Sequence, residues 1–397
     1  MSKTSCVMPH IGLALQNNGD FCCCNVNPLS FKDNNNKVMF VHRDRLKDSW
    51  SSPTRKYLQD SLDSGKRIPE CKHCWDLEDS NQKSPRQTFN ELFKHITPNP
   101  DQPNVFVLKP GNTCNLSCRM CNPETSSNWY RDAHKMAIKK NKFVGTLKDY
   151  TKNFENIRNS FSADNPFWEE FVNWLPSVEY LDIYGGEPFL MDGLFKSLER
   201  VVGKGSENVA LQFHTNAQII NEQYLETVKN YKSVSIGVSI DSHIPKQLEY
   251  IRNGCDAETV FNNAQKIFLF ANTNKNIHTH INLTITTLNI YYLDEIIEDL
   301  EKFGVPISLN FVTGPDKEYD CRYIPIKLKE QIKKKLEKHP QCTSAIEFLM
   351  QEMPTSKVFW HKFWITTDML DSLRNQNFKE TFSEFYKECL EYIPSLV

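Results

Sequence analysis

Three cysteines within eight consecutive residues constrain this chain more than any other feature. Cys114, Cys118 and Cys121 are separated by three and then two residues, and they come soon after the apolar run Val105–Leu108. Three thiols on one short loop can bind three irons of a cubane iron–sulfur cluster, because soft sulfur ligands prefer such clusters or zinc. The loop has no fourth thiol, so one iron would keep an open coordination position, as catalytic metal sites do.

Composition indicates the compartment in which these thiols act. The chain has 397 residues, thirteen of them cysteines, and 47 Lys and Arg against 49 Asp and Glu. No apolar run approaches the roughly 18 residues that a membrane span needs, and residues 1–14 lack the features of a signal peptide. We therefore expect a cytoplasmic protein with no membrane partner, in which cysteines are thiols or metal ligands rather than disulfides. The near-neutral charge argues against nucleic-acid binding as the main function.

The middle of the chain alternates short apolar runs with amphipathic segments, which predicts a parallel sheet with helices outside it. The expected strands are Val105–Leu108, Val178–Tyr184, Val209–His214, Val234–Ile240, His278–Thr286 and Ile307–Phe311. The expected helices include 193–202, 222–230, 257–271 and 293–303.

The two ends of the chain differ from the middle. The first region is rich in turn formers, with one expected strand at Val38–Val41 and one amphipathic helix at Pro53–Leu62. The last region is helical and Lys-rich, and Leu328, Ile332 and Leu336 recur every four residues, as in an amphipathic surface helix. The sequence therefore predicts three regions, 1–103, 104–312 and 313–397.

The cysteine trio resembles the signature of the radical S-adenosylmethionine (radical SAM) enzymes, a Cys-x3-Cys-x2-Cys loop after the first strand of a partial barrel. Other motifs agree in order: Gly185-Gly186-Glu187-Pro188 follows the second strand, Asn216 the third, and Ser239 and Asp241 end the fourth, before Arg252. All lie at carboxyl ends of strands, where parallel barrels place active sites. The resemblance implies an α/β fold, a partial (β/α)6 TIM-like barrel with an N-terminal cysteine-rich auxiliary-cluster module and a helical C-terminal region.

The resemblance also implies cofactors and roles for particular residues. Cys114, Cys118 and Cys121 would hold a [4Fe–4S] cluster that binds S-adenosylmethionine (SAM). Glu187 would hold the SAM amino group and Arg252 its carboxylate. Reductive cleavage of SAM would give a 5′-deoxyadenosyl radical, which abstracts a hydrogen from the substrate. The remaining residues expected to contact the cofactor are Gly185, Gly186, Pro188, Asn216, Ser239 and Asp241.

A second group of cysteines lies in the first region. Twelve residues separate Cys6 from Gly19, four separate Gly19 from Cys24, and Cys71 and Cys74 form a Cys-x2-Cys pair. This order resembles the SPASM and twitch auxiliary modules of radical SAM enzymes, although here the module precedes the barrel. The resemblance implies that Cys6, Cys24, Cys71 and Cys74 hold one auxiliary [4Fe–4S] cluster that relays electrons.

Several alternatives stay open at this point. Cys22 and Cys23 compete with Cys24, which only the spacing from Gly19 favours. Zinc, with His134 completing the trio, would instead make the chain a zinc-binding interaction protein. The substrate is a peptide or protein side chain on family frequency, and the alternative is a sugar, nucleotide or cofactor precursor for a dehydrogenase or cyclase. The electron donor would be a flavodoxin or ferredoxin.

Overall fold

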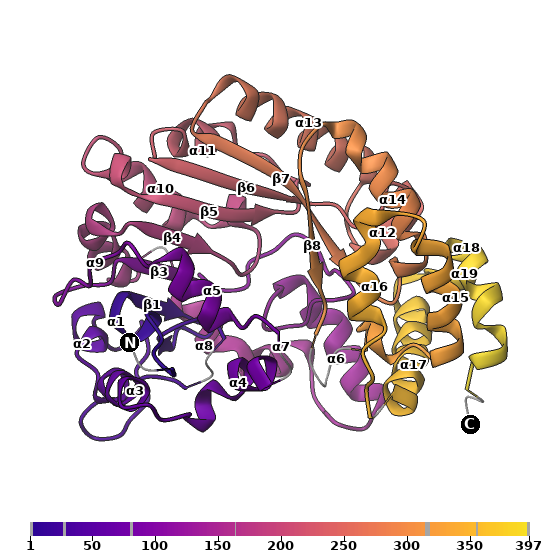
Figure 1. The fold of residues 1–397 in the computed structure, drawn as a ribbon, viewed down its shortest axis with the longest axis horizontal. Helices are drawn as coiled ribbons and strands as arrows, with labels where there is room; N and C mark the ends of the chain where they lie inside the picture. Colours follow the sequence, from indigo (N-terminus) through magenta and orange to yellow (C-terminus); the bar gives the residue numbers. More distant parts are fainter. Residues whose placement is uncertain are drawn as a thin grey trace.

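One eight-stranded sheet runs through the centre of the molecule (Figure 1). The computed structural model describes residues 3–26, 29–79, 82–162, 164–313, 318–354 and 356–394. The strand order is β2-β1-β3-β4-β5-β6-β7-β8, and every neighbouring pair except β1 and β2 is parallel. The strands are β1 (Gly12–Leu15), β2 (Phe21–Cys22), β3 (Val105–Leu108), β4 (Tyr180–Ile183), β5 (Ala210–Thr215), β6 (Ser233–Ser239), β7 (Ile277–Ile285) and β8 (Ile307–Phe311).

The predicted α/β class is confirmed. The six expected strands are β3 to β8, which pair in sequence order as a partial (β/α)6 barrel requires. The bounds of β3 and β8 agree with the expected ones, and those of the other four differ by one or two residues. These small shifts arise because strand ends follow hydrogen bonding rather than the edges of apolar runs.

Helices cover one face of the sheet. Phe106 of β3 packs against Phe171 with ring centroids 5.4 Å apart, and Phe213 of β5 packs against Tyr224 at 5.7 Å. The helices up to β8 are α1 (Met8–Ile11), α2 (Leu46–Trp50), α3 (Pro53–Asp63), α4 (Lys72–Asp79), α5 (Pro85–Leu92), α6 (Tyr130–Lys139), α7 (Leu147–Thr151), α8 (Glu155–Ser160), α9 (Phe167–Trp174), α10 (Asp192–Val201), α11 (Glu222–Val228), α12 (Pro245–Ile251), α13 (Ala257–Thr273) and α14 (Leu293–Leu300).

The first region of the chain supplies an additional strand to the sheet. Gly12 to Leu15 of β1 pair in parallel with Val105 to Leu108 of β3, and all four β1 residues are buried. The strand expected at Val38–Val41 is wrong, because Val38 and Phe40 make only isolated bridges with Lys32 and Asp20. The division into three regions stays a prediction, but β1 makes the first region part of the same sheet as the barrel.

Five helices follow β8 and pack beside α12 and α14 (Figure 1). The predicted amphipathic helix is confirmed, since Leu328, Ile332 and Leu336 are all buried. Tyr250 of α12 contacts Phe382 with ring centroids 5.1 Å apart. These helices are α15 (Ile326–Leu336), α16 (Thr343–Leu349), α17 (Ser356–Arg374), α18 (Phe378–Thr381) and α19 (Ser383–Cys389).

Among the described residues, none of the helices combines the length and apolar character needed to cross a bilayer.

Because β1 is buried within the sheet, we expect it to unfold together with the barrel. Leu13→Ala should lower the free energy of unfolding by about 2–5 kcal/mol, the usual cost of a cavity at a fully buried leucine. Urea unfolding followed by circular dichroism should show one transition. Leu92→Ala, at a side chain with 53% exposure on α5, should change the free energy of unfolding by less than about 0.5 kcal/mol. Separate transitions for the first region and the barrel would contradict this expectation.

Candidate active site

The loop with the cysteine trio leaves the carboxyl end of β3 and is held by its neighbours. The backbone N–H of Arg119 donates to the carbonyl of Ile251 at the end of α12 (2.9 Å or less, at 2.8 Å). The indole N–H of Trp129 donates to the carbonyl of Cys118, also at 2.8 Å. These contacts fix the backbone on both sides of the central thiol.

The three thiols lie close enough to influence one another. The pKa of Cys118 lies well above its usual value, because its thiol hydrogen-bonds with Cys121 and is buried, while the positive charge of Arg252 acts in the opposite direction. Burial also raises the pKa of Cys114 to about 11. Metal binding at this loop would therefore have to displace thiol protons.

The glycine pair after β4 permits the cluster loop to approach closely. Gly185 has a φ of +110°, and a Cβ on Gly186 would lie 2.1 Å from the carbonyl oxygen of Thr113. The backbone N–H of Glu187 donates to that same oxygen at 2.8 Å. We expected these glycines to admit a ligand; the structure shows that they admit the backbone of the cysteine loop.

Glu187 links the ends of β4 and β5. Its side chain accepts hydrogen bonds from the hydroxyl of Thr215 and the backbone N–H of Asn216, both at 2.8 Å, and from the backbone N–H of Phe189 at 3.4 Å. The residue is 1% exposed, and burial raises the pKa of its carboxyl to about 7. Both carboxyl oxygens therefore already have protein donors.

Asp241 and Arg252 are paired with each other. The Nε of Arg252 lies 2.7 Å from a carboxyl oxygen of Asp241, and both side chains are buried. The other oxygen of Asp241 accepts from the backbone N–H of Thr284 at 2.9 Å. Arg252 also acts on the pKa of Cys118, so this ion pair lies near the cysteine trio.

The other residues expected at the cofactor lie at the same edge of the sheet. The Asn216 amide donates to the side-chain oxygen of Asn115 in the cysteine loop at 2.9 Å. Ser239 is the last residue of β6 and is buried. Pro188 begins the short 3-10 turn Pro188–Leu190 after the glycine pair. The carboxyl edge of the sheet thus brings the expected set together, although part of it forms internal pairs.

Sequence reasoning missed Arg119, which lies between two of the cysteines. Its guanidinium is fully buried, pairs with Asp371 of α17 and donates to Gln376 at 2.8 Å. It also lies over the ring of Tyr250, 3.7 Å from the centroid. An arginine inside a cysteine motif is the signal in the sequence, but nothing there identifies its partner 252 positions away.

A second contact joins α17 to the same loop. The Nε of Arg374 donates to Asp132 of α6 at 2.8 Å, and the guanidinium lies 4.8 Å from the ring centroid of Trp129. Since Trp129 in turn donates to Cys118, the last helices of the chain support the cysteine loop at two points.

The face of the sheet opposite the covering helices is polar. Asp182 and Tyr184 of the β4 segment lie on it, together with His214 and His280. Gly237 separates the two imidazoles, and a Cβ there would lie 2.2 Å from the Nδ1 of His214. Burial raises the pKa of Asp182 to about 7. Alternation of polar and apolar residues within β4 is the sequence signal that could have identified this face.

The four cysteines expected to form the auxiliary site line one cavity. Cys6, Cys24, Cys71 and Cys74 all contribute to its wall, and so does Cys23. Burial raises the pKa of Cys6 far above its usual value, and the neighbouring Cys24, Cys71 and Cys74 add to that shift. Four thiols around one cavity match the donor set of a cubane cluster.

Cys22 points elsewhere. Its sulfur accepts a hydrogen bond from the side-chain amide of Gln16 at 3.1 Å, and the side chain packs with Ala14 and Val107 on the polar face. It does not contribute to the wall of the cysteine cavity, whereas Cys23 and Cys24 both do. The choice of ligand in this segment is therefore between those two neighbours.

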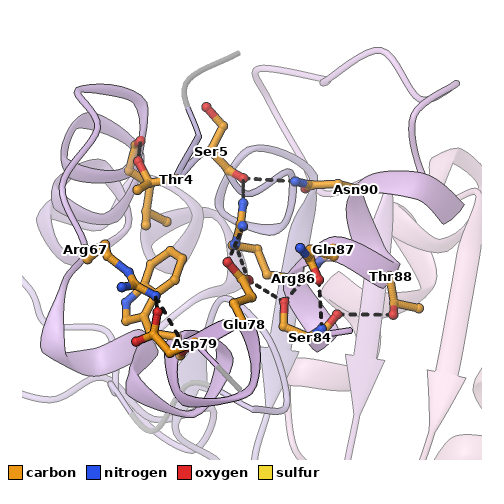
Figure 2. Close-up of polar contacts among 12 residues, drawn as sticks. Thr4, Ser5, Arg67, Glu78, Asp79, Ser84, Arg86, Gln87, Thr88 and Asn90 are labelled. Atoms are coloured by element: carbon orange, nitrogen blue, oxygen red, sulfur yellow. Dashed lines mark hydrogen bonds and ion pairs between the residues drawn. The ribbon is translucent and has the colours of Figure 1, made fainter. Parts of the chain in front are cut away.

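An arginine after the Cys-x2-Cys pair holds the auxiliary segment together (Figure 2). Arg86 pairs with Glu78 of α4 at 2.8 Å and donates to the carbonyl of Ser5 at 2.6 Å. Ser84 also donates to Glu78, and Asn90 donates to Ser5 at 2.9 Å. Because Ser5 precedes Cys6 and Glu78 follows Cys74, this network positions cysteines from distant parts of the segment.

All thirteen cysteines are in the described part of the chain, and none forms a disulfide. Within that part, no three His, Cys, Asp or Glu side chains converge in the geometry of a single metal ion.

Comparison with known proteins agrees with the motif pattern. Residues 108–268 match the family described as the Radical SAM superfamily. This segment contains the cysteine trio, the glycine pair and the buried ion pair, and the match supports a radical SAM enzyme. A search of curated proteins found no significant match.

Solved structures of radical SAM proteins resemble parts of the chain. Native anSMEcpe with bound AdoMet is 15% identical with a TM-score of 0.41, and the match covers 61% of this chain and 62% of that one. SuiB from Streptococcus suis is 15% identical with a TM-score of 0.35, with 83% and 69% covered. The match to anSMEcpe spans about three fifths of that protein.

The buried pair between Arg119 and Asp371 should contribute strongly to stability. Asp371→Asn leaves the Arg119 charge buried with a neutral partner and should lower the free energy of unfolding by about 3 kcal/mol. Chemical denaturation provides the measurement. Asp368→Asn, at an exposed position on the same helix, serves as the matched control and should be neutral. Equal stability of the two variants would show that the pair contributes little.

Asp182 should make stability depend on pH. Its pKa is raised from 3.8 to about 7 in the folded protein, so the folded state retains a proton that the unfolded state has lost. Folding stability from this group is present at low pH and lost as pH rises through 7. Between about pH 5 and about pH 8, wild type should lose about 2–3 kcal/mol of unfolding free energy relative to Asp182→Asn. Urea titrations at both pH values test this, with exposed Asp60→Asn expected to follow wild type.

Proposed function

Because residues 108–268 form a radical SAM domain, we propose that the protein reductively cleaves SAM at a [4Fe–4S] cluster held by Cys114, Cys118 and Cys121. The observation that supports this most directly is the placement of three interacting thiols on one anchored loop at the carboxyl edge of a parallel sheet. When bound, the cluster supplies the electron that splits SAM into methionine and a 5′-deoxyadenosyl radical.

The polar residues around the trio would bind and orient SAM. The ion pair of Arg252 with Asp241 involves Nε, and we assign the SAM carboxylate to the terminal nitrogens of the same guanidinium. We assign the SAM amino group to Glu187. A cation beside that buried carboxyl would favour its ionised form, against the effect of burial on its pKa. Asn216 and Ser239 supply further polar groups at the same edge.

We further propose that Cys6, Cys24, Cys71 and Cys74 hold an auxiliary [4Fe–4S] cluster. Their common cavity and mutual effect on the pKa of Cys6 support this assignment. With four thiols available, no iron need be left open, which favours electron relay over direct substrate binding. The external electron donor in this proposal is a flavodoxin or ferredoxin.

The substrate in this proposal is a peptide or protein side chain. A solved complex of SuiB contains its precursor peptide SuiA, which is a statement about that protein. In this chain, the polar face with Asp182, His214 and His280 would receive the group from which hydrogen is abstracted. Water exclusion there would protect the radical from side reactions.

Cysteine variants test the two cluster assignments separately. The anaerobically reconstituted protein should contain about eight irons, and Cys118→Ala and Cys71→Ala should each contain about four. Cys118→Ala should produce no 5′-deoxyadenosine from SAM with dithionite, whereas Cys71→Ala should retain part of this activity. The measurements are iron and sulfide content and chromatography of the reaction. Cys389→Ala, at a cysteine far from both groups in sequence, is the control and should behave as wild type.

Two outcomes would contradict the proposal. A colourless protein that holds zinc instead of iron would indicate the zinc-binding alternative. Production of 5′-deoxyadenosine by Cys118→Ala at the wild-type rate would show that the trio does not hold the reactive cluster.

A further inference from the structure

A large polar cavity lies beside the loop that follows β1. Its volume is about 560 Å³, within the usual range for small-molecule sites. Gln16, Asn17 and Asn18 form one side, directly after β1, and Asn153 and Asn156 contribute from the region of α8. The two sides are joined where the hydroxyl of Ser160 donates to the carbonyl of Asn18 at 2.9 Å. Since β1 is parallel to β3, this loop leaves the same edge of the sheet as the cysteine loop.

The cavity lies between the two groups of cysteines. Asn25 in its wall directly follows Cys24, and Glu124 comes three residues after Cys121. The side-chain amide of Asn17 donates to the carbonyl of Glu124 at 2.8 Å, which ties the first region to the segment after the trio. A ligand in this cavity would therefore be near both proposed clusters.

The wall is rich in oxygen acceptors and contains no lysine or arginine among the described residues. Its charged members are Asp20 and Glu124, and the remaining polar members are five asparagines and one glutamine. The nearest buried cation, Lys109, gives its hydrogen bond to Gln16 at 2.7 Å rather than to Asp20. The charge of the lining itself is therefore negative.

Three oxygens of this lining are buried without a hydrogen-bond partner among the described residues. They are one carboxyl oxygen of Asp20 and the side-chain oxygens of Asn17 and Asn25. Asp20 is 8% exposed, and its other oxygen accepts from the hydroxyl of Ser30. A buried acceptor without a donor costs about 1–3 kcal/mol, so three around one cavity call for a ligand rich in donors.

We propose that this cavity binds a basic group of the substrate peptide, the ammonium of a lysine or the guanidinium of an arginine. These groups carry three and five N–H donors, no acceptor and a positive charge, which complements acceptors and carboxylates. A lysine or arginine held here would anchor the peptide while another part of it reaches the polar face of the sheet. Calling the ligand a substrate rests on the proposed function; the chemistry of the cavity does not.

Calorimetry with short peptides tests the inference on the full-length protein with both clusters reconstituted. Acetyl-Gly-Arg-Gly-amide or its lysine counterpart should bind at least about tenfold more tightly than the norleucine peptide, which has the length but no charge. Asp20→Asn should weaken binding of the basic peptide by about tenfold. Asp60→Asn, at an exposed aspartate of the same region, should not.

Further arms separate the possible results. Glu124→Gln changes an exposed side chain, so a loss of affinity in this variant cannot be ascribed to misfolding. Agmatine, a free guanidine, should bind more weakly than the arginine peptide; equal affinity would overturn the peptide as the source of the basic group. Equal affinity of norleucine and basic peptides, or no effect of either carboxyl variant, would mean that water alone serves the three oxygens. Binding is measured without SAM turnover, so failure of wild type to cleave SAM would count against the proposed function only.

Discussion

Parallel pairing of β1 with β3, and of β3 through β8, directs the carboxyl ends of seven strands to one edge of the sheet. The cysteine loop, the glycine pair, Glu187 and the ion pair of Asp241 with Arg252 all depend on this alignment for their proximity. The polar cavity depends on it as well, because β1 brings the loop that begins at Gln16 to the same edge. A strand of only four residues thus decides how the first region meets the barrel.

Buried polar contacts then set the details that strand direction leaves open. Glu187 joins the ends of β4 and β5, and Arg119 joins the cysteine loop to α17. Burying a charge is costly unless its partner is well placed, so each pair penalises other arrangements of the same loops. The apolar helices around the sheet supply most of the stability, whereas these pairs specify where the functional loops lie.

The sequence was a good guide to the barrel because its strands are apolar runs of ordinary length between clear turn signals. It also brought Cys6, Cys24, Cys71 and Cys74 together correctly, since their spacing carries chemical information. It missed β1, whose four residues are too few for a periodic pattern, and it wrongly expected a strand at Val38–Val41. The partner of Arg119 and the mutual pairing of Asp241 and Arg252 depend on tertiary contacts that no local pattern encodes.

The contact between Arg119 and Asp371 also has a consequence for the order of events during synthesis. The two residues are 252 positions apart, so a ribosome that adds about 5–20 residues per second makes Asp371 about 10–50 s after Arg119. Until α17 leaves the exit tunnel, the cysteine loop lacks the anchor that it has in the finished molecule. Any delivery of iron that requires the rigid loop must therefore wait for an almost complete nascent chain.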